Sequence, residues 1–459
     1  MEPFTVTFVL VVVAMVSAIV YIISRGQNND LKLPPGPRGL ETLREMEKST
    51  REVTNSRIQN IYFSKLLNKT VTASSPEDSG WHKERKLFYS SIKFYGEGYQ
   101  SIETTIQSEL TRLVDGLQRS GGHDVSIKEV FSNSIINIIS ILLSGEKAEA
   151  GSPIHRAILE CLRTNHDAID VKFFLMAQSF PFMIHVPGSR AKKTWDALCE
   201  AGRRLDQLLY YDVKKSYTPG NPRGLVDVWT EKMLNEESDW MTEGHVLGLI
   251  RDVVIGGNTT TTETLSSAFL YLIHHPDVIN KIRAEVDRVV GPDGRPVLEH
   301  RPKCSYTEAT MLEVLRVVNV TPLLVPHRIT ADMQFRGFHI PKGTTVFSNL
   351  WKFHRSEKLW EDPLSFRPER FLDEQGGLLL ATHPLRQQMI PFGVGKRACP
   401  GESFARTRLF LYITTLLQHF DVLPPETEEL PPLTPDSWIM GGFMVIKPYK
   451  CRFCKRMKQ

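Results

Sequence analysis

The segment 242–274 constrains the fold of this 459-residue chain more than any other part of it. It reads as one continuous helix, because Thr242 is a suitable N-cap and Pro276 stops the helix directly after the segment. At ~1.5 Å per residue such a helix is nearly 50 Å long, enough to cross a large domain. No Gly/Ser-rich linker, charge run or internal repeat divides the chain after residue 40. The sequence therefore predicts one large, mainly helical domain.

Two adjacent glycines, Gly256 and Gly257, lie inside this helix and are followed by Asn258, Thr259 and Thr260. A glycine in a helix interior costs about 1 kcal/mol relative to alanine, so the pair requires a reason.

Cys399 follows a glycine-rich turn and precedes a second apolar-periodic helix that opens near Ser403. The positive end of that helix and its free amide groups favour a thiolate over a thiol. A metal ligand has to be deprotonated, so Cys399 is a candidate ligand. The alternative is a buried structural thiol, since free cysteine is among the most buried residue types.

The surrounding pattern decides between these alternatives. Phe392, Gly395, Arg397, Cys399 and Gly401 fill the spacing Phe-x-x-Gly-x-Arg-x-Cys-x-Gly, which resembles the haem-binding signature of the cytochrome P-450 family. In that family the cysteine thiolate is the axial ligand of the haem iron. The arginine pairs with a haem propionate and the phenylalanine shields the sulfur. The resemblance implies a mainly α fold with a small β region, haem b as cofactor and Cys399 as metal ligand.

Further motifs occur in the order that the family has them. Trp81 and Arg85 lie four residues apart, on one helix face, and match its Trp-x-x-x-Arg motif, whose residues bind haem propionate. Alone, the pair would be a surface cation–aromatic contact. His327 in Pro-His-Arg is a further expected propionate partner, and residues 323–325 are expected to face the substrate.

An expected ion-pair network joins two later motifs. Glu313 and Arg316 lie at i,i+3 in a helix that Ser305 opens with a predicted capping box. By itself, such a pair usually contributes a few tenths of a kcal/mol at the surface. The resemblance implies a buried triad instead, with Arg370 of Pro-Glu-Arg-Phe as the third member.

The glycine pair and its threonines resemble the family's oxygen-binding motif, Ala/Gly-Gly-x-Asp/Glu-Thr. Thr260 then takes the place of the threonine that helps to deliver protons, and Thr259 stands in the acidic position. A register one residue earlier would put Asn258 in that position and make Thr259 the threonine. We prefer Thr260, because the residues that follow then align without a gap.

The N-terminal region predicts a membrane anchor. Residues 3–24 carry no charge and are long enough to span the ~30 Å hydrocarbon core as a helix. A cleaved signal peptide is the alternative, but a basic n-region is missing and basic residues follow the segment. The positive-inside rule places the remaining chain in the cytosol. We therefore predict an anchor over residues 1–24, a proline-rich hinge over 25–40, and a catalytic domain over 41–459 at the endoplasmic reticulum membrane.

Two segments stay open. Residues 41–80 are short and polar where the family has a helix and the first strands of its small sheet, so much of that sheet is expected to be missing. Residues 180–187 are apolar and broken by prolines, which indicates either a buried loop or a second lipid contact beside the substrate entrance. Residues 102–117 and 125–143 are expected to form core helices.

Charge and cysteine usage exclude other classes of protein. The net charge of +4 is too small and scattered for nucleic-acid binding, and the six cysteines show no disulfide framework. No Gly-x-Gly-x-x-Gly fingerprint for a dinucleotide occurs in the chain. The expected electron donor is therefore a separate NADPH-dependent flavoprotein of the cytochrome P-450 reductase type.

The sequence thus predicts a membrane-anchored haem-thiolate monooxygenase that inserts one oxygen atom of O2 into an apolar small molecule. Two alternatives remain. Thr259 in the acidic position suggests a haem-thiolate isomerase or dehydratase that works without NADPH. The short segment 41–80 suggests a non-catalytic haem binder or a truncated product.

Overall fold

The computed structural model describes residues 56–57, 79–97, 102–170, 173, 176, 179–235, 240–291 and 293–457. The helices are α5 (Ser79–Glu97), α6 (Ile102–Arg119), α7 (Ile127–Ser144), α8 (Pro153–Ala168), α10 (Arg190–Asp206), α11 (Asp212–Lys215), α12 (Leu225–Leu234), α13 (Glu243–His274), α14 (Pro276–Val289), α15 (Ser305–Val318), α16 (Leu350–Phe353), α17 (Pro384–Gln387) and α18 (Glu402–His419). Short helical turns are η1 (Pro181–His185), η2 (Gln207–Tyr211), η4 (Leu298–Lys303), η5 (Pro368–Phe371), η6 (Gly395–Arg397) and η7 (Pro435–Ser437). The predicted mainly helical fold is confirmed.

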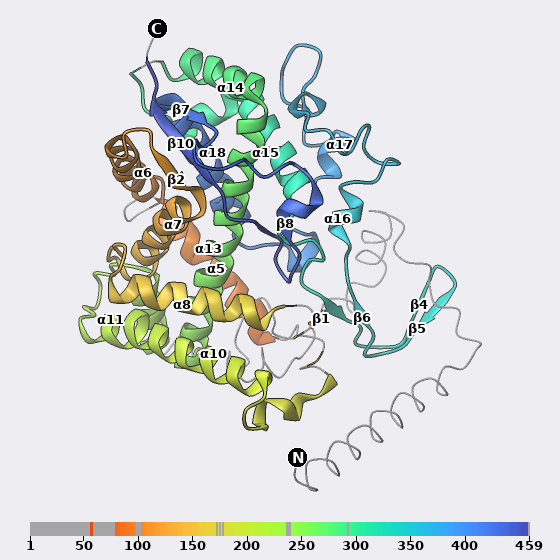
Figure 1. The fold of residues 1–459 in the computed structure, drawn as a ribbon. Helices are drawn as coiled ribbons and strands as arrows, with labels where there is room; N and C mark the ends of the chain where they lie inside the picture. Colours follow the sequence, from red (N-terminus) through yellow and green to blue (C-terminus); the bar gives the residue numbers. More distant parts are fainter. Residues whose placement is uncertain are drawn as a thin grey trace, which may run out of the picture.

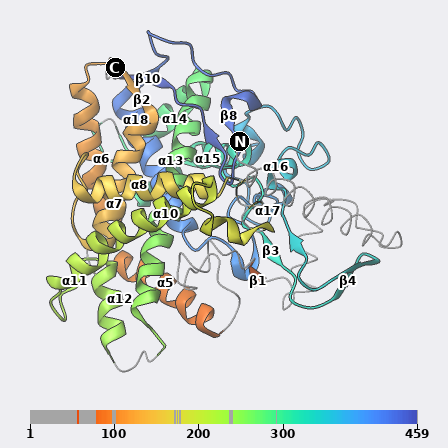
Figure 2. The same ribbon diagram turned by 60° about the horizontal axis from the view of Figure 1, so that its bottom comes forward.

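The long helix α13 runs through the middle of the molecule, with α6, α7, α8 and α10 on one side of it and the strands β3–β6 on the other (Figures 1 and 2). The expected start is correct: the backbone N–H of Thr242 donates to Nδ1 of His245 at 3.1 Å, which satisfies one amide of the first turn. At Gly257 the helix approaches α7 so closely that an added Cβ would lie 2.8 Å from Cδ1 of Ile139. Close helix packing is therefore one reason for a glycine at this position.

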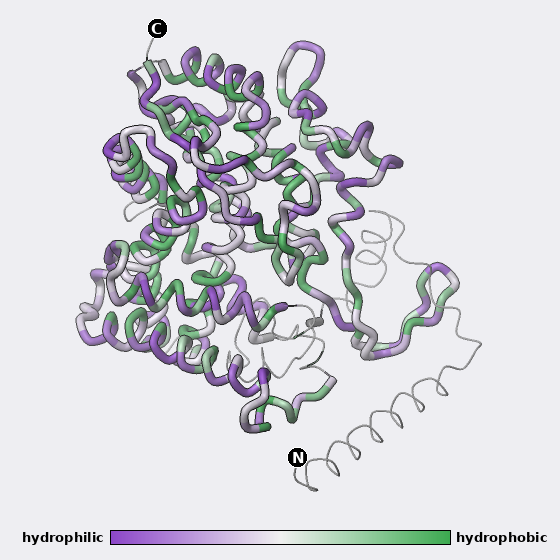
Figure 3. Tube along the Cα trace, in the orientation of Figure 1, coloured by the Kyte–Doolittle hydropathy of each residue, from purple (hydrophilic) through white to green (hydrophobic). Residues whose placement is uncertain are grey.

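The core forms because α6 and α7 turn their apolar faces towards α13 and α18. Ile106, Leu110 and Leu117 of α6 are buried, as their helical spacing predicts. Phe131 of α7 packs against Phe269 of α13 with ring centroids 5.2 Å apart. Hydrophobic residues accordingly gather in the interior and hydrophilic ones on the outer helices and loops (Figure 3).

The β structure is small and lies at the periphery. The strands are β1 (Ser56–Arg57), β2 (Asp124–Ser126), β3 (His327–Arg328), β4 (Met333–Phe335), β5 (Phe338–Ile340), β6 (Thr345–Val346), β7 (Phe420–Leu423), β8 (Trp438–Ile439), β9 (Val445–Ile446) and β10 (Lys450–Lys455). They form antiparallel sheets in the orders β1-β3-β6, β2-β10-β7, β4-β5 and β8-β9. β1 falls within the segment 41–80 and pairs with β3, so one strand of the expected sheet is present there. The first two residues of the expected helix 125–143 belong to β2 instead.

The predicted capping box at the start of α15 is wrong. Cys304 is the N-cap residue and has no capping side-chain bond, while Glu308 binds Arg301 at 2.6 Å. The carboxylate of Glu285, from α14, accepts hydrogen bonds from the amides of Tyr306 and Thr307 at 2.8 Å each. A neighbouring helix therefore satisfies the amides that the local sequence was expected to satisfy.

The predicted membrane anchor, hinge and most of the segment 41–80 lie outside the described residues. Within the described part of the chain, α7 alone is long and apolar enough to span a membrane, and 67% of it is buried. This burial fits the core role expected for it. In the segment 180–187, Ile184 is buried whereas Phe182 is 60% exposed, so the segment is buried in part, and both alternatives for it stay predictions.

Candidate functional site

The loop that carries Cys399 has a defined shape. The amide of Cys399 donates to the carbonyl of Phe392 at 2.8 Å and closes the loop just before α18. Gly393 and Gly395 have φ angles of 74° and 70°, in the left-handed region that glycine adopts without strain. A Cβ at Gly401 would lie 3.9 Å from the sulfur of Cys399. The glycines of the motif thus set the turn and leave room beside the thiol.

Trp81, Arg85 and Arg397 come together at this loop, although 313 positions separate Arg85 from Ala398. The guanidinium of Arg397 lies 3.8 Å from the ring centroid of Trp81, and both side chains are buried. Arg85 donates to the carbonyl of Ala398 and also to the hydroxyl of Tyr89 at 3.0 Å. The structure therefore joins two motifs that the sequence could relate only by resemblance.

The predicted thiolate of Cys399 stays a prediction, and the surroundings of the sulfur act on it in opposite directions. The side chain is exposed, yet protein atoms surround the sulfur closely enough that desolvation raises the pKa of the thiol. The amide of Gly401 and the charges of Arg85 and Arg408 act in the expected direction, but they are outweighed. A metal ion deprotonates a thiol that coordinates it, so the role of Cys399 as a ligand does not require a low pKa of the free thiol.

Glu313, Arg316 and Arg370 form the expected buried triad. Glu313 and Arg316 are both 0% exposed, and Nε and Nη2 of Arg316 donate to the two carboxylate oxygens at 2.7 and 2.8 Å. Nε of Arg370, from η5, reaches the same carboxylate at 3.1 Å. The triad therefore ties α15 to the segment before the Cys399 loop.

On α13, the glycines and threonines divide between two faces. Gly256 is exposed with open space where a Cβ would stand, and the hydroxyl of Thr260 donates to its carbonyl at 2.7 Å. Thr259 and Thr260 are half-buried, whereas Asn258 and Thr261 are buried on the other face. Thr260 thus lies one turn from the open glycine.

His327 lies in β3, where its backbone pairs with Arg57 and Val346. The side chain is half-buried, and its expected contact with a propionate stays a prediction. Of residues 323–325, Leu324 packs with a small cluster that includes Val394 of the Cys399 loop, whereas Val325 is exposed.

Arg408 is the residue near the site that sequence reasoning missed. It lies in the apolar stretch of α18, is 2% exposed, and donates to the carbonyl of Gly257 on α13 at 2.8 Å. The available signal was a charged residue amid the apolar residues of a core helix.

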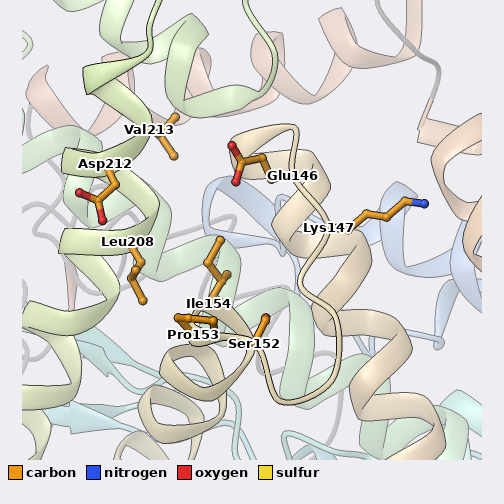
Figure 4. A pocket seen from close by; sticks show the side chains of 8 residues that line it. All are labelled: Glu146, Lys147, Ser152, Pro153, Ile154, Leu208, Asp212 and Val213. Atoms are coloured by element: carbon orange, nitrogen blue, oxygen red, sulfur yellow. The ribbon is translucent and has the colours of Figure 1, made fainter.

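A surface hollow of about 290 Å³ lies elsewhere, between the α7–α8 connection and the η2–α11 segment (Figure 4). It is lined by Glu146, Lys147, Ser152, Pro153, Ile154, Leu208, Asp212 and Val213. None of the predicted site residues lines it, so we do not assign it to the chemistry.

Comparison with known proteins identifies the family. The cytochrome P450 family model matches residues 39–453. The chain is 32% identical over 358 residues to cytochrome P450 2U1 of Mus musculus, a match covering 77% of this chain and 66% of that protein. It is 33% identical over 400 residues to steroid 17-alpha-hydroxylase/17,20 lyase of Mesocricetus auratus, covering 83% and 75%. It is 32% identical over 380 residues to cytochrome P450 2B4 of Oryctolagus cuniculus, covering 82% and 76%. The chain therefore belongs to the cytochrome P450 family.

The matches to cytochromes P450 2U1 span slightly less than two thirds of those relatives, with 66% for the mouse protein and 65% for the human one. Cytochromes P450 carry haem with a cysteine thiolate as axial ligand. The residues present here fit that cofactor, because a free cysteine, a glycine next to its sulfur and nearby guanidinium groups occur together.

Proposed function

We propose that this chain is a haem-thiolate monooxygenase of the endoplasmic reticulum membrane, with Cys399 as the axial ligand of the haem iron. The observation that carries the proposal is the convergence of Trp81, Arg85 and Arg397 on the Cys399 loop. Members of the family are haem-thiolate monooxygenases. When bound, haem supplies the oxygen chemistry, in which one atom of O2 enters the substrate and the other leaves as water.

Residues of the chain would bind the haem, shield its sulfur ligand and support the site. Trp81, Arg85, Arg397 and His327 would hold the haem propionates, because guanidinium, indole and imidazole N–H groups donate to carboxylates. Phe392, whose carbonyl closes the Cys399 loop, would shield the thiolate from water. The triad would keep the α15 side of the core in register.

Thr260 would hold the proton that the reaction uses. Its hydroxyl stands one turn from the open Gly256, where a small ligand has space. Thr259 points about 100° away around the helix, from ~3.6 residues per turn. We therefore keep Thr260 as the proton-delivering residue and Thr259 as the residue in the acidic position.

Electrons would come from NADPH through a separate flavoprotein reductase, and the substrate would be an apolar small molecule. Residues 1–24 would anchor the protein with its C-terminal part in the cytosol. If so, the protein resists carbonate extraction while its C-terminal tail remains accessible to protease on intact microsomes. Protection of the tail would reverse the proposed orientation.

The test of ligation is the ferrous–CO spectrum of the purified holoprotein. Wild-type protein should show the red-shifted Soret band of thiolate-bound haem, and Cys399→Ser should lose it. Cys454→Ser, a matched change at a partly exposed cysteine in β10, should keep it. A red-shifted band that survives in Cys399→Ser ends the assignment.

The test of the proton site compares two neighbouring substitutions. Loss of a positioned hydroxyl should divert reduced oxygen to peroxide without preventing CO binding. Thr260→Ala should therefore keep the CO spectrum and NADPH consumption while product per NADPH falls and H2O2 rises. Thr259→Ala should do less. The reverse order would shift the register by one residue.

A second function stays open because Thr259 replaces the acidic residue. A haem-thiolate isomerase or dehydratase needs no external electrons, so product formation without NADPH would favour it. A chain that folds yet never takes up haem would instead be a non-catalytic or truncated product.

A further inference from the structure

Arg408 is a buried cation without a carboxylate partner. Its side chain is 2% exposed, and its hydrogen-bond acceptors are two backbone carbonyls, of Gly257 at 2.8 Å and of Phe404 at 3.4 Å. No Asp or Glu of the described residues lies within ion-pair distance of it. Burying an uncompensated charge is costly, so the sequence should keep one there only for a reason.

The guanidinium lies between two elements of the proposed site. Side chains of a helix point back towards its N-terminus, and that of Arg408 lies over the ring of Phe404, 3.9 Å from its centroid, in the first turn after the Cys399 loop. The same guanidinium donates a hydrogen bond to the carbonyl of Gly257 on α13, the neighbour of Gly256, where an added Cβ would meet nothing within 4 Å. The positive charge thus lies between the first turn of α18, directly after the Cys399 loop, and the glycine pair of α13.

We propose that Arg408 is a positioning residue whose buried charge raises the reduction potential of the haem iron held by Cys399. The inference rests on the proposed function, since it requires Cys399 to be the ligand. Reduction of the ferric iron adds one electron, supplied by the reductase. A fixed positive charge in a low-dielectric surrounding stabilises the more negative, reduced state.

Burial lowers the pKa of Arg408 to about 10. Arg408 therefore remains charged at neutral pH.

The experiment is a spectroelectrochemical titration of the substrate-free holoprotein. Arg408→Gln removes the charge but keeps an N–H donor for the Gly257 carbonyl, so its midpoint potential should shift to a more negative value. Arg408→Lys keeps the charge and should stay near the wild-type value. Arg406→Gln is the matched control, because Arg406 is partly exposed and pairs with Glu402 at 2.9 Å. A merely structural role would leave the potential of Arg408→Gln unchanged.

Two results overturn the inference: an unchanged potential in Arg408→Gln, or an equal shift in Arg406→Gln. If the wild-type CO complex lacks the red-shifted Soret band, the proposed function fails. If the band is present and the potential does not move, the inference about Arg408 alone fails.

Should Arg408→Gln fail to retain haem, Arg408→Lys decides the matter. The groups facing this position are the Gly257 carbonyl of α13, Phe404 and Tyr412 of α18, and Cys399. Tyr412 stays neutral because burial raises its pKa. A buried lysine loses its proton at a lower pH than an arginine. The potential of Arg408→Lys should therefore fall at alkaline pH relative to wild type, and an equal pH dependence of both proteins contradicts the inference.

Discussion

Replacing Glu313 by glutamine tests the buried triad most directly. Arg316 uses all five of its N–H groups: two donate to Glu313 and the others to the carbonyls of His354, Pro363 and Ser365. Oε1 of Glu313 accepts from Arg316, from Arg370 and from the amide of Arg367 at 2.8, 3.1 and 2.9 Å. Among the described residues, Glu313 is the acid that pairs with both buried guanidinium groups, and Glu313→Gln removes its charge and sets an NH2 donor against one of them.

The expected loss is about 3–5 kcal/mol of unfolding free energy, the range for breaking a buried ion pair on one side. The control is Glu361→Gln, because Glu361 is 81% exposed and binds Arg367 at 2.7 Å. An exposed pair of this kind contributes about 0–1 kcal/mol. Urea unfolding followed by far-UV circular dichroism, with the Soret band recorded in parallel, compares the two. Equal midpoints for both variants would refute the reasoning that burial makes the triad strong.

Three further outcomes follow from the packing. Gly256→Ala should raise the unfolding free energy by about 1 kcal/mol, measured by urea unfolding. Gly257→Ala should raise it less, because the new Cβ meets Cδ1 of Ile139. Adding Ile139→Val to Gly257→Ala removes that atom, so the double variant should recover the missing gain. Trp81→Leu should speed haem loss more than Trp81→Phe, since phenylalanine keeps an aromatic face for Arg397; equal rates of transfer to apomyoglobin would contradict this. Glu263 is 2% exposed and binds Lys128 at 2.6 Å, and burial raises the pKa of its carboxyl group. In the unfolded chain this pKa is about 4.3. The unfolding free energy of the wild type should therefore fall as the pH rises from about 4.3 through the raised pKa of the folded protein. Glu263→Gln should not lose stability over this pH range. If the Tm difference between Glu263→Gln and the wild type is the same at every pH, the raised pKa of Glu263 is contradicted.

The sequence was sufficient to predict those parts of the fold and the site that depend on a local pattern of residues. The extent of α13 follows from its N-cap and the proline after it, and the turn of the Cys399 loop follows from glycines at fixed spacing. The partners of Glu313 were also predictable, because the motif around Arg370 has a recognisable form.

The misses arise where distant segments meet. Glu285 caps α15 from α14, and no local pattern shows that a neighbouring helix supplies the carboxylate. Arg408 and Gly257 are separated by 151 positions, so their hydrogen bond depends on how α18 crosses α13.

Charge balance connects the proposed cofactor to the stability of the site. The charge of Glu402 and the charges of Arg85 and Arg408 act on the Cys399 thiol in opposite directions. Glu402 pairs with Arg406 at 2.9 Å, whereas no carboxylate in the described ranges lies within ion-pair distance of Arg85 or Arg408. A haem with two propionates and a thiolate ligand would supply the missing negative charge, so binding should stabilise the fold by linkage. It follows that the chain without haem should be the less stable form, and that the surplus of positive charge around Cys399 is a property of the haem site rather than of the fold.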